Sequence, residues 1–80
     1  MGKGKSRSER FAEAQASISI AKNDIENLRD ELQEWLDNMP ENLQASTKAD
    51  QLQEAIDQLE EVISQLEEAE GATVEFPGMY

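Results

Sequence analysis

The residues best able to do chemistry in this sequence are its carboxylates, because the chain holds 18 Asp and Glu residues but no His and no Cys. Without His and Cys, imidazole catalysis, thiol chemistry, disulfides and zinc fingers are all excluded. A di-iron helical bundle needs Glu and His at facing core positions, and these acids mostly lie outside the apolar positions. No nucleophile is paired with a base. We therefore predict no catalytic residue, no cofactor and no metal site.

The segment "GKGKS" at residues 2–6 contains the end of a phosphate-binding loop pattern. The complete pattern needs another Gly, separated from Gly-Lys-Ser by four residues, and a buried strand ahead of it. Neither is present. We interpret residues 1–7 as a basic, flexible N-terminal arm.

The net charge of −11 is unevenly distributed along the chain. Residues 1–7 carry three bases and no acid, whereas residues 49–70 carry no base. The eight acids of that second segment are Asp50, Glu54, Asp57, Glu60, Glu61, Glu67, Glu68 and Glu70. Such a surface repels nucleic acid and anionic membranes and attracts basic proteins. We therefore predict a protein partner with a basic surface, no direct nucleic-acid binding and no membrane binding.

Two long helices are predicted to position these charges. The first has a heptad stripe of apolar residues. Its members are Phe11, Ala14, Ile18, Ala21, Ile25, Leu28, Leu32, Trp35 and Met39. Ser6 and Glu9 have the spacing of a capping box, and Pro40 disfavours helix at Met39. The first helix is predicted over residues 8–38.

The second helix is predicted over residues 47–70. Its stripe is Ala45, Ala49, Leu52, Ile56, Leu59, Ile63 and Leu66. Thr47 with Asp50 offers a second capping box, and Gly71 suits the C-terminal cap. Residues 39–46 then form a turn, and residues 71–80 form an apolar C-terminal tail in which "TVEF" alternates as a strand would.

The fold class predicted from these elements is all-α, an antiparallel helical hairpin resembling a coiled coil. Folding the chain back near residue 42 brings large residues of one stripe opposite smaller or complementary ones of the other, for example Trp35 opposite Ala49 and Leu28 opposite Ile56. Ile20, Leu36 and Val62 widen the apolar faces beyond a two-helix seam. We therefore expect a homodimer of hairpins forming a four-helix bundle. A parallel dimeric coiled coil through the second helix is the alternative.

Three groups of residues are candidates for partner binding. The acids Glu54, Asp57, Glu61 and Glu68 form the outer face of the second helix. Trp35, Met39 and Leu43 would make an apolar tip at the turn, although the stripe position of Trp35 favours a core role. Phe76, Met79 and Tyr80 lie in the tail. The tail either packs Val74 and Phe76 beside Phe11 or adds a strand to a partner.

The segments "RDELQEWLDNMPENLQAS", "LQEAIDQLEEVISQLEEAE" and "VEFPGMY" together resemble small acidic proteins encoded by bacteriophages and prophages. The resemblance implies a virus-encoded accessory protein that binds and inhibits a host factor, such as a defence or nucleic-acid-handling protein. Inhibition by DNA mimicry is one form of this hypothesis. Helix 47–70 bears one acid per ~4 Å of axis at a rise of 1.5 Å per residue, less than half the density of DNA.

Two other function classes remain open. The uninterrupted heptads are also typical of a structural or assembly protein. An oligomeric sponge for a small signalling nucleotide is a weaker alternative, because only Lys22, Arg29 and Lys48 lie in or between the helices. The chain has no apolar run of the ~20 residues that a membrane span needs and no apolar stretch after its first basic residues. A cytoplasmic location is expected, in the host cell if a phage encodes the protein.

Overall fold

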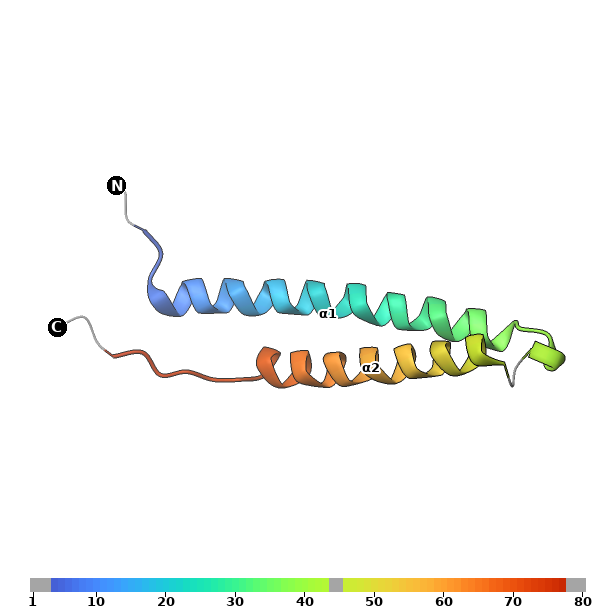
Figure 1. Ribbon diagram of the computed structural model, residues 1–80. Coiled ribbons are helices and arrows are strands. Elements are labelled where there is room, and N and C mark those ends of the chain that lie inside the picture. The colour runs from blue at the N-terminus through green and yellow to red at the C-terminus, as the bar shows by residue number, and fades with distance from the viewer. Residues whose placement is uncertain (1–3, 44–45, 78–80) are drawn as a thin grey trace.

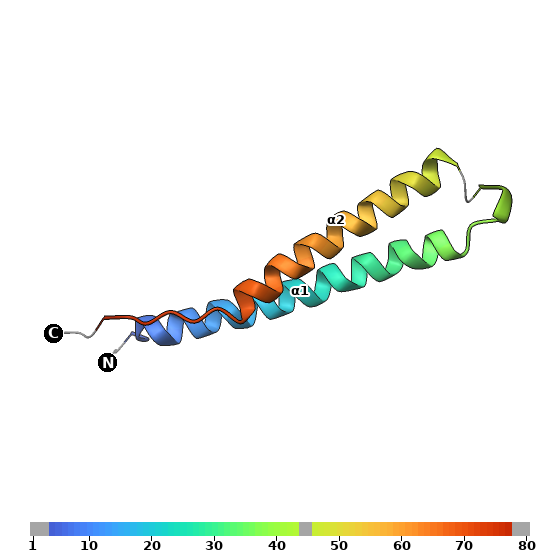
Figure 2. The ribbon, with the colours of Figure 1, turned by 90° about the horizontal axis from the view of Figure 1, so that it is seen from below.

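The protein is an antiparallel helical hairpin, as predicted. The computed structural model describes residues 4–43 and 46–77. Helix α1 (Arg7–Asp37) and helix α2 (Thr47–Glu70) lie side by side and are joined through a short 3₁₀ helix, η1 (Glu41–Leu43) (Figure 1). The molecule is a rod of 67 × 22 × 14 Å. The start of α1 and the segment after α2 lie at one end of the rod, opposite η1 (Figure 2).

The first helix begins at the predicted capping box. The Ser6 hydroxyl accepts a hydrogen bond from the Glu9 N–H (3.1 Å), and the Glu9 carboxylate accepts one from the Ser6 N–H (2.9 Å). These two bonds satisfy N–H groups that a helix start leaves without partners. The helix ends at Asp37, where the Asn38 N–H still reaches the Glu34 carbonyl at 3.0 Å. Pro40 follows and prevents further helix.

The second helix starts at the predicted residue but with a different cap. Ser46, rather than Thr47, is the N-cap residue, and its hydroxyl accepts from the Ala49 N–H at 3.3 Å. The predicted Thr47–Asp50 capping box is therefore wrong. The extended backbone of Ser46 aims its own hydroxyl at the first turn. Gly71 closes the helix as predicted, with its N–H donating to the Glu67 carbonyl at 3.1 Å.

The fully buried core of the described chain is small and comes from α2 alone: Ala49, Leu52, Ile56 and Ile63. Described residues of α1 are at most half-buried, because a single neighbouring helix covers only part of its surface. The half-buried positions of α1 are Phe11, Gln15, Ile18, Ser19, Lys22, Ile25, Glu26, Arg29, Leu32, Gln33 and Leu36. Five members of the predicted stripe, namely Phe11, Ile18, Ile25, Leu32 and Met39, are thus partly covered.

The other members of the predicted α1 stripe are exposed, which corrects the predicted layers. Ala14, Ala21, Leu28 and Trp35 all lie in contact with solvent. The prediction was wrong because α1 is rotated about its axis relative to a symmetric coiled-coil seam. The rotation turns the line of Gln15, Lys22, Arg29 and Leu36 toward α2.

The segment after α2 runs back along the first turns of α1 (Figure 2). The Phe76 ring packs edge-on against the Phe11 ring, with centroids 5.9 Å apart. This contact agrees with the packing alternative for Phe76, whereas Val74 remains 51% exposed. The described residues 72–77 contain no strand, and the addition of a strand to a partner stays a prediction.

Candidate protein-interaction surface

The outer side of α2 carries a continuous row of exposed carboxylates. We name this set the acidic face: Asp50, Glu54, Asp57, Glu60, Glu61 and Glu68. Glu54, Glu61 and Glu68 recur every seventh residue, so their Cα atoms are about 10.5 Å apart along one line of the helix. The face exists because Leu52, Ile56 and Ile63 occupy the opposite, buried side at the helical period.

The remaining two acids of α2 are neutralised by α1. Lys22 Nζ lies 3.0 Å from Glu70 Oε1 and 3.8 Å from Glu67 Oε2, and the Ser19 hydroxyl also donates to Glu70. These contacts lower the pKa of Glu70, chiefly through the Ser19 hydrogen bond and then through Lys22. The Glu70 hydrogen bond likewise raises the pKa of Lys22.

The acidic face itself has no such neutralisation. Within residues 4–43 and 46–77, no Lys or Arg nitrogen lies within 4.0 Å of its carboxylates. Asp57 accepts only a neutral hydrogen bond, from Gln53 Nε2 at 3.0 Å. Six uncompensated negative charges therefore point into solvent along one helix. Their field attracts a cationic surface.

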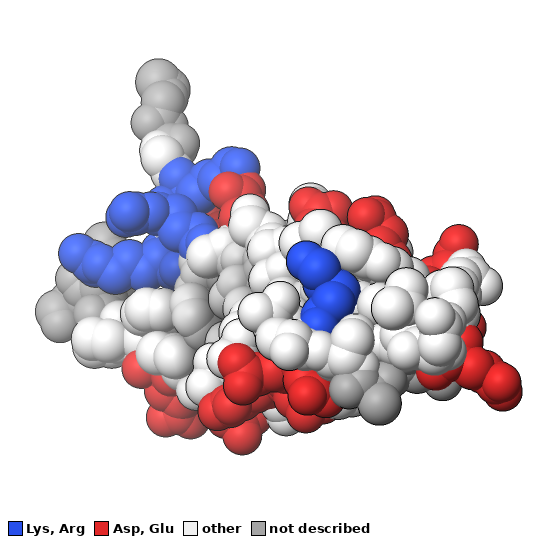
Figure 3. Space-filling view, turned by 45° about the vertical axis from the view of Figure 1, so that its right-hand side comes forward, with Lys and Arg blue, Asp and Glu red and all other residues white. Residues whose placement is uncertain are grey.

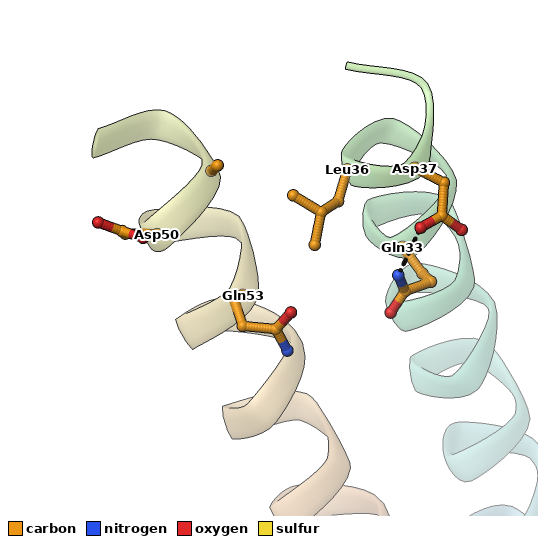
Figure 4. A pocket seen from close by; sticks show the side chains of 6 residues that line it. Gln33, Leu36, Asp37, Asp50 and Gln53 are labelled. Atoms are coloured by element: carbon orange, nitrogen blue, oxygen red, sulfur yellow. Dashed lines mark hydrogen bonds between the residues drawn. The ribbon is translucent and has the colours of Figure 1, made fainter. Parts of the chain in front are cut away.

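A groove adjoins the acidic face at the connection end of the hairpin. It lies between the last turns of α1 and the first turns of α2, and its lining is Gln33, Leu36, Asp37, Ala49, Asp50 and Gln53. Leu36 points from α1 toward α2, whereas Asp50 points away from α1 (Figure 4). Asp37 accepts a hydrogen bond from Gln33 Nε2 at 3.0 Å.

The chemistry of the groove suits a basic side chain. Leu36 and Ala49 give it apolar surface, and Asp37 and Asp50 are the two acidic residues of its lining. Lys and Arg bury an aliphatic stem along apolar surface and keep the charged head among polar groups. The lining residues of α1 have i, i+3, i+4 spacing and those of α2 have i, i+1, i+4 spacing, so each set lies within one helical turn on its side of the connection. The helical spacing of these residues was therefore visible in the sequence, but the position of the turn did not show which residues of α1 would lie opposite which residues of α2.

The basic residues of the rod are concentrated at one end. Figure 3 shows a group of Lys and Arg at the end where α1 begins, one further basic residue near the middle of the view, and Asp and Glu mostly along its margins. The basic group includes Lys5, Arg7 and Arg10, and Lys5 pairs with Glu13. A basic partner would therefore meet α2 rather than the start of α1.

The predicted apolar tip is only partly present. Trp35 is 50% exposed, so it does not belong to the core of the single hairpin. Its ring lies on the flank of the hairpin, with Lys48 Nζ 5.6 Å from the ring centroid. Leu43 is 44% exposed in η1, and Met39 is half-buried. Because α1 is rotated about its axis, the Trp35 ring lies beside the start of α2 and not at the tip of the hairpin.

The predicted tail residues differ in position. Phe76 is half-buried against Phe11 and is not presented as a free anchor. Met79 and Tyr80 lie outside the described residues. The glutamine Gln15, which the sequence did not single out, ties α1 to the end of α2 through hydrogen bonds from Nε2 to the Ala72 carbonyl (2.6 Å) and the Ala69 carbonyl (3.3 Å).

No protein-family model, curated protein or solved structure matches the chain. In the described part of the chain, no three acidic side chains converge as metal ligands would. Neither described helix combines the length and apolarity needed to cross a membrane. The functional argument therefore depends on the surface of the hairpin.

Proposed function

We propose that the protein is a non-enzymatic interaction protein that docks its acidic face onto a basic surface of another protein. The observation that carries the proposal is the row of six exposed carboxylates of α2 without cationic neighbours in the described chain. An isolated acidic helix is stabilised by nearby cations, so acids left unpaired over this length favour a role outside the hairpin. The groove at Leu36 and Ala49 would accept one Lys or Arg of the partner.

Inhibition of a host protein is the form of this function that we favour. The resemblance to small phage-encoded acidic proteins supports it, and so does a rigid rod whose charges are held at fixed spacing. The target would be a host protein with a cationic groove, such as a defence or nucleic-acid-handling protein. A single α2 mimics DNA only weakly, since its charge density is less than half that of the duplex. The proposed target is therefore bound by surface complementarity as well as charge.

The experiment is affinity capture from bacterial lysate with the intact protein, followed by mass spectrometry. We expect one dominant host protein whose recovery falls as salt rises, because exposed charge pairs are screened over about 10 Å at 0.1 M salt. The test variant is the triple reversal Glu54→Lys, Glu61→Lys and Glu68→Lys. It changes the net charge from −11 to −5, since each reversal adds two charges. It should abolish capture while leaving the far-UV circular dichroism unchanged.

A matched control separates a specific face from net charge. The triple reversal Asp24→Lys, Glu34→Lys and Glu41→Lys also gives −5 but alters exposed acids outside α2. Capture should survive in this variant. Equal loss in both variants would mean that only total charge matters, and undiminished capture by the α2 variant would refute the role of the acidic face. Recovery of the bait alone would favour the assembly alternative.

A further inference from the structure

We propose that two copies of the chain associate through one flank of the hairpin, with their connection ends pointing in opposite directions. We name this flank the apolar strip: Ala14, Ala21, Leu28 and Trp35 of α1, with Ala55, Val62 and Ala69 of α2, and Lys48 at the connection end of the α2 line. The proposal goes beyond the proposed function and does not depend on it, because the apolar strip and the acidic face share no residue.

The two halves of the apolar strip lie on the same side of the hairpin. Residues seven apart in a helix lie nearly above one another on the same face. On α1 this row ends at Trp35, and on α2 the row through Val62 begins at Lys48; both residues lie at the connection end of the hairpin. The contact between Lys48 Nζ and the Trp35 ring joins those two lines. The Lys22 contact with Glu70 belongs to the other side of the hairpin, because Lys22 is turned about 100° from Ala21 around α1.

This flank leaves large apolar side chains in water. Leu28 and Trp35 are each 50% exposed, and Val62 is 37% exposed. Apart from Lys48 at its end, the strip contains no charged residue, although the chain as a whole carries 25 Lys, Arg, Asp and Glu residues. Single exposed apolar residues are ordinary, but an aligned and uncharged set marks an interaction surface. A chain of this size with four buried core residues also needs further burial for stability.

The dimensions of the strip suit a second copy of the same rod. From Ala14 to Trp35 it runs 21 residues, or about 32 Å. Two helices side by side are about 20 Å wide. The footprint is thus on the order of 600 Å² per copy, near the ~800 Å² per partner of a standard interface. Two such faces together make a four-helix bundle.

Side-chain volume determines how the two copies are oriented. The strip has four layers, which pair Trp35 with Lys48, Leu28 with Ala55, Ala21 with Val62 and Ala14 with Ala69. If the copies pointed the same way, one layer would hold two Trp and two Lys and another would hold four Ala. If they point in opposite ways, the bulky Trp35 layer meets the layer of Ala14 and Ala69, and the two middle layers of similar volume meet each other. Interiors are filled evenly at high density, so the opposed arrangement is favoured.

Charge favours the same orientation. Residues 34–54 at the connection end carry five acids and one base, whereas residues 4–13 and 71–77, which lie together at the other end, carry three bases and three acids. Copies pointing the same way would place two strongly acidic ends together. Opposed copies place each acidic end beside the basic start of α1 of the other copy. Side-chain volume and charge therefore both favour a second copy of the chain, in the reversed orientation, as the partner that covers the apolar strip.

Sedimentation analysis of the full chain tests the association. We expect a monomer–dimer equilibrium that tightens as salt rises, because salt screens the repulsion between two chains of charge −11. The Leu28→Asp variant should weaken the dimer by at least ~100-fold, the effect of burying an unpaired charge. The matched control is Ile20→Asp, since Ile20 is 66% exposed on α1 but outside the strip. It should change the dimer constant by less than ~3-fold.

A spin label tests the orientation on an otherwise native chain. The chain has no Cys, so Asn42→Cys in η1 gives one label per copy. Opposed copies place the labels about 40 Å or more apart, because each lies beyond the end of α1, about 19 Å from the strip centre. A distance below about 25 Å would overturn the opposed arrangement. A chain that stays monomeric at millimolar concentration would overturn the whole proposal.

The two measurements remain decisive if Leu28→Asp fails to fold, because the labelled chain retains the intact strip. They are also separable from the proposed function. The triple reversal on the acidic face should leave the dimer in place, and loss of the dimer in Leu28→Asp does not remove a carboxylate. Salt acts in opposite directions on dimerisation and on partner capture.

Discussion

Truncation of Ile56 to Ala should destabilise the protein more than any equivalent change on α1. Ile56 is 2% exposed and is the largest fully buried side chain in the described chain. The change removes three carbon groups, worth about 2.4 kcal/mol at ~0.8 kcal/mol each. A residual cavity adds to this cost, and the better helix propensity of Ala returns a few tenths of a kcal/mol. We expect a net loss of about 2–3 kcal/mol.

That loss is a large share of the total stability. An 80-residue domain has about 4–12 kcal/mol of unfolding free energy at 0.05–0.15 kcal/mol per residue. At about 4–8 °C per kcal/mol for a domain this small, Tm should fall by about 10–20 °C. The assay is urea and thermal unfolding followed by circular dichroism, with every variant at the same chain concentration, because self-association makes Tm depend on concentration.

The control is the same substitution at an exposed site. Ile20→Ala removes identical atoms from a side chain that is 66% exposed, so its effect should lie within about 0.5 kcal/mol of zero. The argument would be refuted if the two variants lost similar stability. In that case α2 would not present Ile56 to α1, and the register of the hairpin would be different.

Two further predictions concern the end of the rod opposite η1. Phe76→Ala should lower the free energy of unfolding, measured in urea, by about 1–2 kcal/mol, because it removes the edge contact with Phe11 and half-buried apolar surface. The control Val74→Ala should lower it by less than ~0.5 kcal/mol, since Val74 is 51% exposed. Equal effects would mean that the tail does not pack on α1. The stability advantage of the wild type over Glu70→Gln should depend on pH. Because the folded-state pKa of Glu70 is lowered from 4.5, the advantage is complete above that pH and is lost as pH falls through the folded pKa. The Tm difference between the two proteins, measured from pH 7 to about pH 3, should shrink in acid, and a constant difference would contradict the prediction.

Local sequence signals predicted the elements of this fold well. Heptad periodicity and Pro40 placed both helices and the turn between them, and Ser6 with Glu9 gave the correct capping box. Such features depend on residues within one or two turns of each other. The choice between Ser46 and Thr47 as N-cap failed because adjacent hydroxyl residues offer nearly the same local bonds.

The rotation of α1 could not be predicted from a stripe. Heptad positions assume a symmetric seam, whereas α1 is held by contacts that are distant in sequence. Gln15 bonds to the carbonyls of Ala69 and Ala72, and Lys22 bonds to Glu70. These pairs turn the polar line of α1 inward and leave Trp35 on the flank. The acidic face could be predicted, because it follows from composition and period alone, but the apolar strip became visible only with this rotation.

The separation of the two surfaces has a consequence for salt dependence. Acidic-face residues such as Glu54 and Glu61 lie about 100° around α2 from the line of Ala55 and Val62. A dimer joined by the strip therefore leaves both acidic faces in solvent and doubles the charge that one particle presents. Salt strengthens that dimer but weakens each contact with a basic partner. A partner that contacts both acidic faces of one dimer should accordingly lose affinity more steeply with salt than it does with Leu28→Asp, which presents a single acidic face.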